Sequence, residues 1–421
     1  MKIPRIFLHI TILLTCLLTS TCSPKTTSSI AEKSRINQQV DLHPKLQFFR
    51  QDHKLLRLYF SLPTENLLFA RRSENQPLQA ELRVTVSGID SKAELKHWEI
   101  TRDYRLSKKH SDFFWIDHLD LSSKSDYRGE AIVTIQDLVR GAEFTAYTRI
   151  SEARISSQKF LTIDASSKAP LLKEYYHTTD SLIIHYGKSD ATELYVNIYD
   201  YPENAAPAPF VEPWKLHLPK FQKQLQILVR DQKCKLPHTL KPKIFEIRAD
   251  SESDDYGLIL PFFKPGFPKI KDGEDMIYPL RYITTDEEFD KLKASNNYRK
   301  SAEEFWLKRC KSKDKARDIL GEYYRRVLYA NENFTSFVPG WKSDRGMIYT
   351  IFGNPDNITK RPGQEIWVYG REINTVRLSF TFVQRENMFS FNHYELLRNG
   401  GYKAIWDLAT NSWRNGRIFN Y

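Results

Sequence analysis

The sequence predicts a mainly β protein in which two tandem antiparallel β-sandwich domains, of the immunoglobulin-like kind, precede a C-terminal α+β domain. Short runs of alternating apolar and polar residues recur through residues 40–155 and again through 156–270, as half-buried strands require. Residues 271–421 add runs with helical periodicity. The 421 residues suffice for two or three domains, and the aromatic content of 13% suits sandwich cores.

The first 21 residues have the pattern of a signal peptide. Lys2 and Arg5 form a positive start, and residues 6–18 are mostly apolar but too short to span a membrane comfortably. Small residues then lead to Cys22, as in a bacterial lipoprotein signal. We expect cleavage before Cys22, a lipid on its thiol, and a flexible tether over residues 22–39. The alternative is an ordinary secretory signal with an incidental cysteine.

A lipid on Cys22 would place the protein at the outer membrane. Surface-export signals resemble acidic clusters just after the cysteine, and none follows here. We therefore expect the protein to face the periplasm, with the cell surface as the alternative. The net charge of +11 is of a kind that often indicates nucleic-acid binding, but the export signal and the scattered basic residues argue against that partner. A solvated surface explains the charge, and attraction to anionic lipid headgroups is the alternative.

Both predicted sandwiches consist of short strands separated by turn residues. In the first, residues 40–155, strands are expected at 46–50, 56–62, 82–86, 113–116, 131–135 and 142–147. In the second, residues 156–270, they are expected at 182–186, 194–199, 225–229, 244–247 and 256–260. Prolines between 202 and 213 predict a long loop. The segment 264–276 is rich in Pro, Gly and charged residues, and we expect it to be a linker.

The predicted C-terminal domain, residues 271–421, mixes helices and strands. Two capping-box patterns, Thr285 with Glu288 and Ser301 with Glu304, mark expected helix starts. Helices are expected at 302–310, 313–331 and 402–414. Strands are expected at 346–352, 365–369, 376–383 and 388–392.

The most distinctive stretch is Gly340-Trp341-Lys342-Ser343-Asp344-Arg345-Gly346. Its two glycines suggest a tight turn with unusual backbone angles ahead of a buried strand. The stretch resembles the signature of the GWxTD domain, a family of bacterial envelope proteins found largely in Bacteroidota, with Ser343 at the position of the family's Thr. Further residues that resemble the family pattern are Glu304, Trp306, Glu322 and Arg326. After Trp306 the chain departs from the Arg-Asp-Pro turn of the family. The resemblance covers the last third of the chain and implies a compartment rather than an activity.

Two interpretations of the charges in this stretch are open. In the structural one, Ser343 or Asp344 caps the turn and Arg345 pairs with a helix carboxylate, Glu304 or Glu322. Trp341 would then fill a core against a helix face made of Tyr323, Tyr324 and Val327. In the catalytic one, Glu304 and Asp344 act as an acid/base pair. We favour the structural interpretation, so no catalytic residue is predicted.

The sequence predicts no metal site and no cofactor. It has no C-x-x-C, no H-E-x-x-H and no nucleotide-binding fingerprint. Cys234 and Cys310 lie in different predicted domains, and we expect them to be unpaired.

These observations favour an outer-membrane lipoprotein that is a non-enzymatic binding or scaffold subunit of an envelope complex. Its expected partners are proteins, such as machinery for outer-membrane protein assembly or secretion. One alternative is an enzyme that acts on envelope glycans or peptides through carboxylates of the C-terminal domain. The other is a carbohydrate-binding protein, which the many aromatic residues suggest. A cleft with two carboxylates would favour the enzyme, and an exposed row of aromatic side chains would favour carbohydrate binding.

Overall fold

The computed structural model describes most of the chain beyond residue 41. The described residues are 42–51, 55–90, 95–107, 113–150, 155–188, 190–211, 218–237, 239, 241–252, 255–361, 363–370, 377–385, 387–390 and 392–421. The predicted signal peptide, the lipidation site Cys22 and the tether lie outside them. The predicted fold class is confirmed, because the described chain is mainly β, with several antiparallel sheets and a C-terminal region of helices and strands.

Two sheets form the first sandwich. One has the order β1-β2-β5, with β1 at Lys45–Gln51, β2 at Leu55–Pro63 and β5 at Phe114–Asp120. The other has the order β4-β3-β6-β7, with β3 at Gln79–Asp90, β4 at Leu95–Ser107, β6 at Gly129–Asp137 and β7 at Glu143–Ile150. Alternate residues of β2 and β6 are buried, so the period-two pattern of the sequence corresponds to a core between the sheets.

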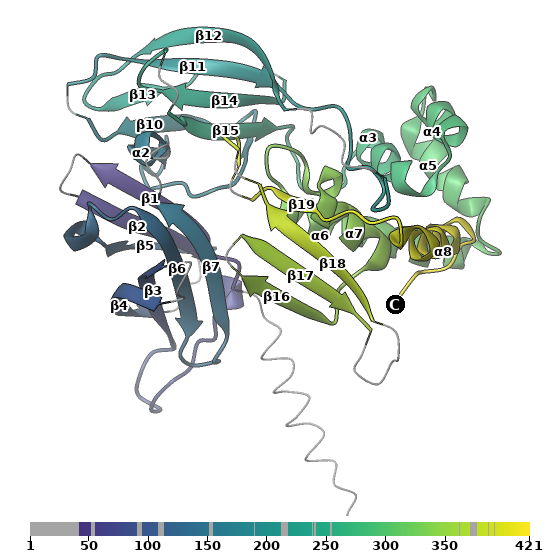
Figure 1. The fold of residues 1–421 in the computed structure, drawn as a ribbon, viewed down its shortest axis with the longest axis horizontal. Helices are drawn as coiled ribbons and strands as arrows, with labels where there is room; N and C mark the ends of the chain where they lie inside the picture. Colours follow the sequence, from purple (N-terminus) through teal and green to yellow (C-terminus); the bar gives the residue numbers. More distant parts are fainter. Residues whose placement is uncertain are drawn as a thin grey trace, which may run out of the picture.

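The second sandwich also has two sheets, preceded by the short helix α2 (Ile155–Gln158). The order β13-β10-β8 joins Lys233–Lys235, Leu182–Tyr186 and Phe160–Asp164. The order β12-β11-β14-β15-β9 joins Lys220–Leu228, Glu193–Asp200, Lys243–Arg248, Leu258–Phe263 and Tyr176–His177. Figure 1 shows this sandwich above the other two parts of the molecule.

The C-terminal region packs helices against a four-stranded antiparallel sheet (Figure 1). The sheet has the order β16-β17-β18-β19, at Asn357–Arg361, Gln364–Tyr369, Leu378–Gln384 and Tyr394–Leu396. The helices are α3 (Gly273–Ile277), α4 (Asp286–Lys293), α5 (Tyr298–Leu307), α6 (Lys313–Phe334), α7 (Asp344–Phe352) and α8 (Tyr402–Arg414), with 3-10 turns at Tyr278–Ile283 and Gly340–Lys342. Trp306, Tyr323, Trp367 and Trp413 are among its fully buried side chains, so one aromatic core unites the helices and the sheet.

The strand predicted at 346–352 is wrong, because these residues belong to α7. All nine residues of α7 are buried, and a short, mostly apolar run that is buried on every side does not reveal its period. The strand predicted at 388–392 is also absent from the described residues there, and the last strand is β19. The capping box predicted at Ser301 is wrong as well, since α5 begins earlier and Asn297 caps it. The capping box of Thr285 with Glu288 is present.

The predicted linker 264–276 is a packed corner instead of a flexible connection. Phe267 stacks on Phe263, with ring centroids 4.3 Å apart, and is 8% exposed. The ammonium group of Lys264 lies 2.6 Å from Asp272 and 2.7 Å from Asp275. Asp272 and Asp275 also form the capping box that starts α3. The Pro, Gly and charged residues here form a turn whose side chains pack and pair with neighbours. Composition alone does not distinguish such a packed turn from a flexible linker.

Candidate functional site

The signature turn at residues 340–346 is built into the C-terminal core. Its glycines are required by close packing, since neither has a positive φ angle, contrary to the unusual backbone angles that the sequence suggested. A Cβ atom on Gly340 would lie 1.8 Å from the carbonyl oxygen of Ala330 in α6, and one on Gly346 would lie 1.8 Å from the carbonyl oxygen of Gly340. A side chain at position 340 would therefore push the turn away from α6, and one at position 346 would push the start of α7 away from the turn.

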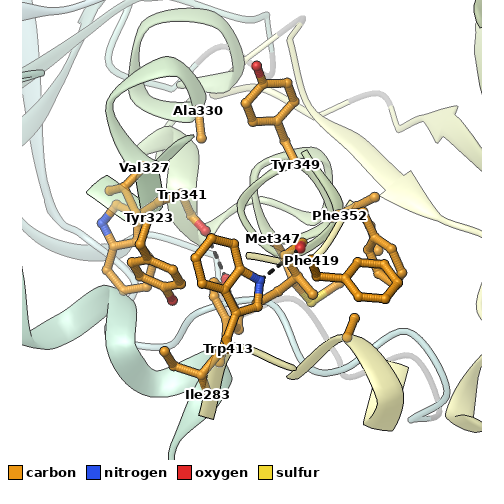
Figure 2. Close-up of a cluster of buried hydrophobic side chains, with 14 of the residues drawn as sticks. Ile283, Tyr323, Val327, Ala330, Trp341, Met347, Tyr349, Phe352, Trp413 and Phe419 are labelled. Carbon is orange, nitrogen blue, oxygen red and sulfur yellow. Dashed lines mark hydrogen bonds between the residues drawn. The ribbon is translucent and has the colours of Figure 1, made fainter. Parts of the chain in front are cut away.

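Trp341 is a core residue. It is 8% exposed and belongs to the same buried cluster as Tyr323, Tyr324 and Val327, as the sequence predicts. Figure 2 shows it in this cluster with Tyr323 and Val327. The hydroxyl of Tyr282 donates to the backbone carbonyl of Trp341 over 2.8 Å, and the two rings meet edge to face at 6.0 Å.

Ser343 and Asp344 begin α7. The hydroxyl of Ser343 accepts from the backbone N–H of Gly346 at 3.1 Å, which is the geometry of an N-cap. Asp344 occupies the first turn, where a carboxylate is favoured by the helix dipole. Its Oδ2 accepts from Arg398 Nη1 at 3.0 Å and from the backbone N–H of Leu396 at 2.8 Å. The side chains of Asp344 and Arg398 are each 8% exposed, so this is a buried, bidentate ion pair.

Arg345 points toward the sheet. Its Nη1 lies 3.2 Å from Oε1 of Glu365 on β17, and Nη2 donates to the backbone carbonyl of Asn392 at 2.8 Å. The predicted pairing with Glu304 or Glu322 is therefore wrong, because the helical conformation of α7 brings this side chain to Glu365 of the sheet. The guanidinium also lies 4.2 Å from the ring of Tyr394. Burial, with the charge of Glu365, raises the pKa of Tyr394 to about 12.

Glu322 and Arg326 form a second cluster at the other end of α7. Arg326 is 2% exposed, and its Nε lies 2.7 Å from Glu322 Oε1. Its two other nitrogens donate to the backbone carbonyls of Ile351 at 3.2 Å and Phe419 at 3.1 Å. Burial lowers the pKa of Arg326 despite the charge of Glu322. The pair therefore ties α6 to the end of α7 and to the C-terminal residues.

Trp306 and Glu304 lie on opposite sides of α5. Trp306 is fully buried, and its Nε1 lies 3.5 Å from the hydroxyl of Tyr324. The Glu304 side chain is 50% exposed and lies 4.0 Å from Lys300. Each carboxylate of the acid/base pair that the sequence left open has a cation as its partner: Asp344 has Arg398 in the core, and Glu304 has Lys300 on the surface.

A loop of the second sandwich, residues 201–211, lies across the signature, and we call it the strap. The backbone N–H of Ala206 donates to the carbonyl of Lys342 at 2.8 Å, and Lys342 Nζ donates to the carbonyl of Glu203 at 2.8 Å. Arg398 Nη2 donates to the carbonyl of Pro207 at 3.2 Å. Burial lowers the pKa of Lys342 to about 8. The sequence predicted a loop here but gave no signal of its contact with Arg398, which is remote in the chain.

A cavity of about 540 Å³ lies where the three parts meet, and we call it the central cavity. Its wall includes residues of β1 and β7 from the first sandwich and of β15 from the second. From the C-terminal region it includes Arg345, Glu365, Trp367 and Tyr394. Of the described residues that the sequence singled out as site candidates, only Arg345 lines it.

Other kinds of site find no support within the described residues. No group of three or more His, Cys, Asp or Glu residues is placed to hold a metal ion there. Cys234 and Cys310 are both free thiols, as expected. None of the helices in the described part of the chain has the length and apolar character needed to cross a membrane.

Comparison with known families agrees with the signature. Residues 243–415 match the family described as the GWxTD domain. The chain contains a GWxTD domain. The match begins at the first residue of β14, so the matched region includes β14 and β15 of the second sandwich as well as the helices and the four-stranded sheet. No curated protein matches the chain.

Proposed function

We propose that this protein is a non-enzymatic binding or scaffold subunit of a cell-envelope complex, anchored to the outer membrane by a lipid on Cys22 and facing the periplasm. The observation that carries the non-enzymatic part is the pairing of the signature charges. Asp344 is held by Arg398 and Arg345 by Glu365, both in buried pairs. Buried charges that neutralise each other in this way stabilise the fold, and neither partner is left as a free charge to bind a substrate.

The strap supports a scaffold role. It fastens the second sandwich to the GWxTD domain through Lys342, Arg398 and Asn399, whose backbone N–H donates to the carbonyl of Pro209 at 3.2 Å. Parts joined by several hydrogen bonds and a shared core hold their relative positions. A fixed arrangement suits the display of a binding surface more than opening and closing around a substrate.

The anchor is tested by Cys22→Ser. We expect this variant to remain unlipidated and to leave the outer membrane, because a serine hydroxyl does not replace the thiol that carries the lipid. Cys16→Ser is the matched control, since it makes the same change inside the apolar segment and leaves the proposed lipid site intact. Cell fractionation after a high-salt wash separates the two. Retention of Cys22→Ser in the outer-membrane fraction would contradict the anchor.

The binding role is tested by chemical crosslinking and pull-down of the full chain from native membranes. We expect envelope proteins to be recovered with the wild type at a fixed ratio. Recovery of the full chain alone, together with turnover of an envelope glycan or peptide that Asp344→Asn abolishes without loss of stability, would instead favour the enzyme alternative.

A further inference from the structure

The strand β16 is an open edge of the GWxTD sheet. It is the first strand in the order β16-β17-β18-β19, and within the described residues it pairs with β17 alone. All five of its residues, Asn357–Arg361, are exposed. An edge of this kind presents backbone N–H and C=O groups that an additional strand can pair with.

The strand β7 is a second open edge, and it faces the same cavity. It ends the order β4-β3-β6-β7, and its consecutive residues 144–148 line the central cavity together with Ile358, Lys360 and Arg361 of β16. The Lys360 ammonium lies 5.9 Å from the ring of Phe144 on β7. Figure 1 shows β7 next to the sheet that contains β16. Within the described residues no backbone pairing joins the two strands.

The charge of β16 has two explanations. Lysine on an edge strand commonly prevents pairing with a second copy of the protein. That explanation does not account for the position of Lys360, which lies in the wall of a cavity lined by three parts of the same chain. Other cations of the cavity wall already have partners: Lys45 lies 3.1 Å from Glu174, and Arg345 is paired with Glu365. Lys360 and Arg361 have no ion-pair partner among the described residues.

We propose that the central cavity receives an extended segment of a partner polypeptide, which adds to β16 as an extra strand between β16 and β7. Ile358 and Lys360 lie on one side of β16 because side chains alternate along a strand. The added strand therefore presents an apolar residue beside Ile358 and a carboxylate beside Lys360, as favourable cross-strand pairs require. Backbone hydrogen bonds supply the pairing and the two side chains supply the selectivity.

This inference rests on the proposed binding role and specifies its partner as a peptide segment in which apolar and acidic residues alternate. The cavity volume falls in the range of sites that enclose small ligands. It therefore encloses a short stretch of extended chain, and a longer peptide would continue outside it along the edges.

The experiment uses a fluorescent nine-residue peptide in which valine alternates with glutamate, titrated into the full chain purified in detergent and followed by fluorescence anisotropy. We expect binding that Lys360→Glu weakens about fivefold or more, because a like charge replaces an opposite one across the strand pair. Lys223→Glu is the matched control. It makes the same change on β12, another edge strand, which does not line the cavity.

Two further peptides separate strand addition from simple charge attraction. A peptide with alternate backbone nitrogens methylated keeps the charges but loses the donors, and we expect it not to bind. A peptide with lysine in place of glutamate should bind at least fivefold more weakly than the glutamate peptide. Absence of binding, equal effects of Lys360→Glu and Lys223→Glu, or undiminished binding of the methylated peptide would each overturn the inference. These results are independent of the Cys22→Ser fractionation and of the pull-down, so failure here leaves the proposed function standing.

Discussion

The signature turn and the edge strand β16 belong to one GWxTD domain and use charge in opposite ways. In the signature, Asp344 and Arg345 are buried and paired with Arg398 and Glu365. In β16, Lys360 and Arg361 are exposed and have no ion-pair partner among the described residues. Burying these charges costs desolvation free energy, which the close pairing with opposite charges offsets. The arrangement in β16 leaves charge and backbone accessible to another molecule.

The difference shows that a conspicuous motif need not be the place where function occurs. The residues that make the signature recognisable are those whose geometry tolerates little change: two glycines in contact with backbone, an indole in the core and a buried ion pair. The β16 strand carries no such signal, since Asn-Ile-Thr-Lys-Arg is an ordinary exposed sequence. Only its position, at a sheet edge beside the central cavity, indicates a binding role.

The largest effect is expected for Trp341→Ala. Removing a buried indole leaves a cavity beside Tyr282 and should lower the free energy of unfolding by about 3–5 kcal/mol. Denaturant unfolding of the full chain measures it. Trp341→Phe keeps an aromatic ring in the same place and should cost clearly less. A Trp341→Ala protein as stable as wild type would contradict the assignment of Trp341 to the core.

A smaller effect is expected for Lys342, and it depends on pH. Burial lowers its pKa from the ordinary 10.5 to about 8 in the folded protein, so between those values the unfolded chain binds more protons. Stability of the wild type should therefore rise from pH 8 to pH 10.5 relative to Lys342→Met, by about 1–2 kcal/mol because the side chain is only partly buried. Thermal melts of both proteins across this range measure the difference. A difference in stability between the two proteins that does not change with pH would show that the Lys342 ammonium is solvated and is not buried against the strap.

The smallest effect on stability is expected for Lys360→Gln. An exposed edge lysine contributes little to the fold, and the free energy of unfolding should change by less than about 0.5 kcal/mol. Its contact with Phe144 lies at the outer limit of a cation–π interaction. If Lys360→Gln destabilised the protein as much as a substitution of Asp344 or Arg398, the claim that the β16 charges do not stabilise the fold would be wrong.

Much of the fold could be predicted from the sequence, namely those segments whose apolar residues recur with a clear period of either a strand or a helix. The alternating residues of β2 and of β3 predicted strands, and the stripe of residues in α6 and in α8 predicted helices. The sequence failed for α7, since the mostly apolar run Met347–Phe352 is buried on all sides and a buried helix then resembles a buried strand. It also failed for segment 264–276, because the same Pro, Gly and charged residues occur in packed turns and in flexible linkers.

The site was predictable only in its local part. Ser343 as a cap and Trp341 in the core follow from residue type and position. The partners of Asp344 and Arg345 are Arg398 and Glu365, which are distant in the chain, and no spacing rule connects them. The central cavity is made of segments from all three parts, so it exists only once the tertiary structure is known.

The ion pair of Asp344 with Arg398 gives the most direct test of the claim that the signature is structural. Free energies of unfolding would be measured for Asp344→Asn, Arg398→Met and the double variant. Each single change leaves a buried partner unpaired and should cost about 3 kcal/mol. The double variant should cost less than the sum of the two by about 1–3 kcal/mol, since the pair is removed together. Costs that simply add, or an Asp344→Asn protein as stable as wild type that no longer binds its envelope partner, would contradict the account.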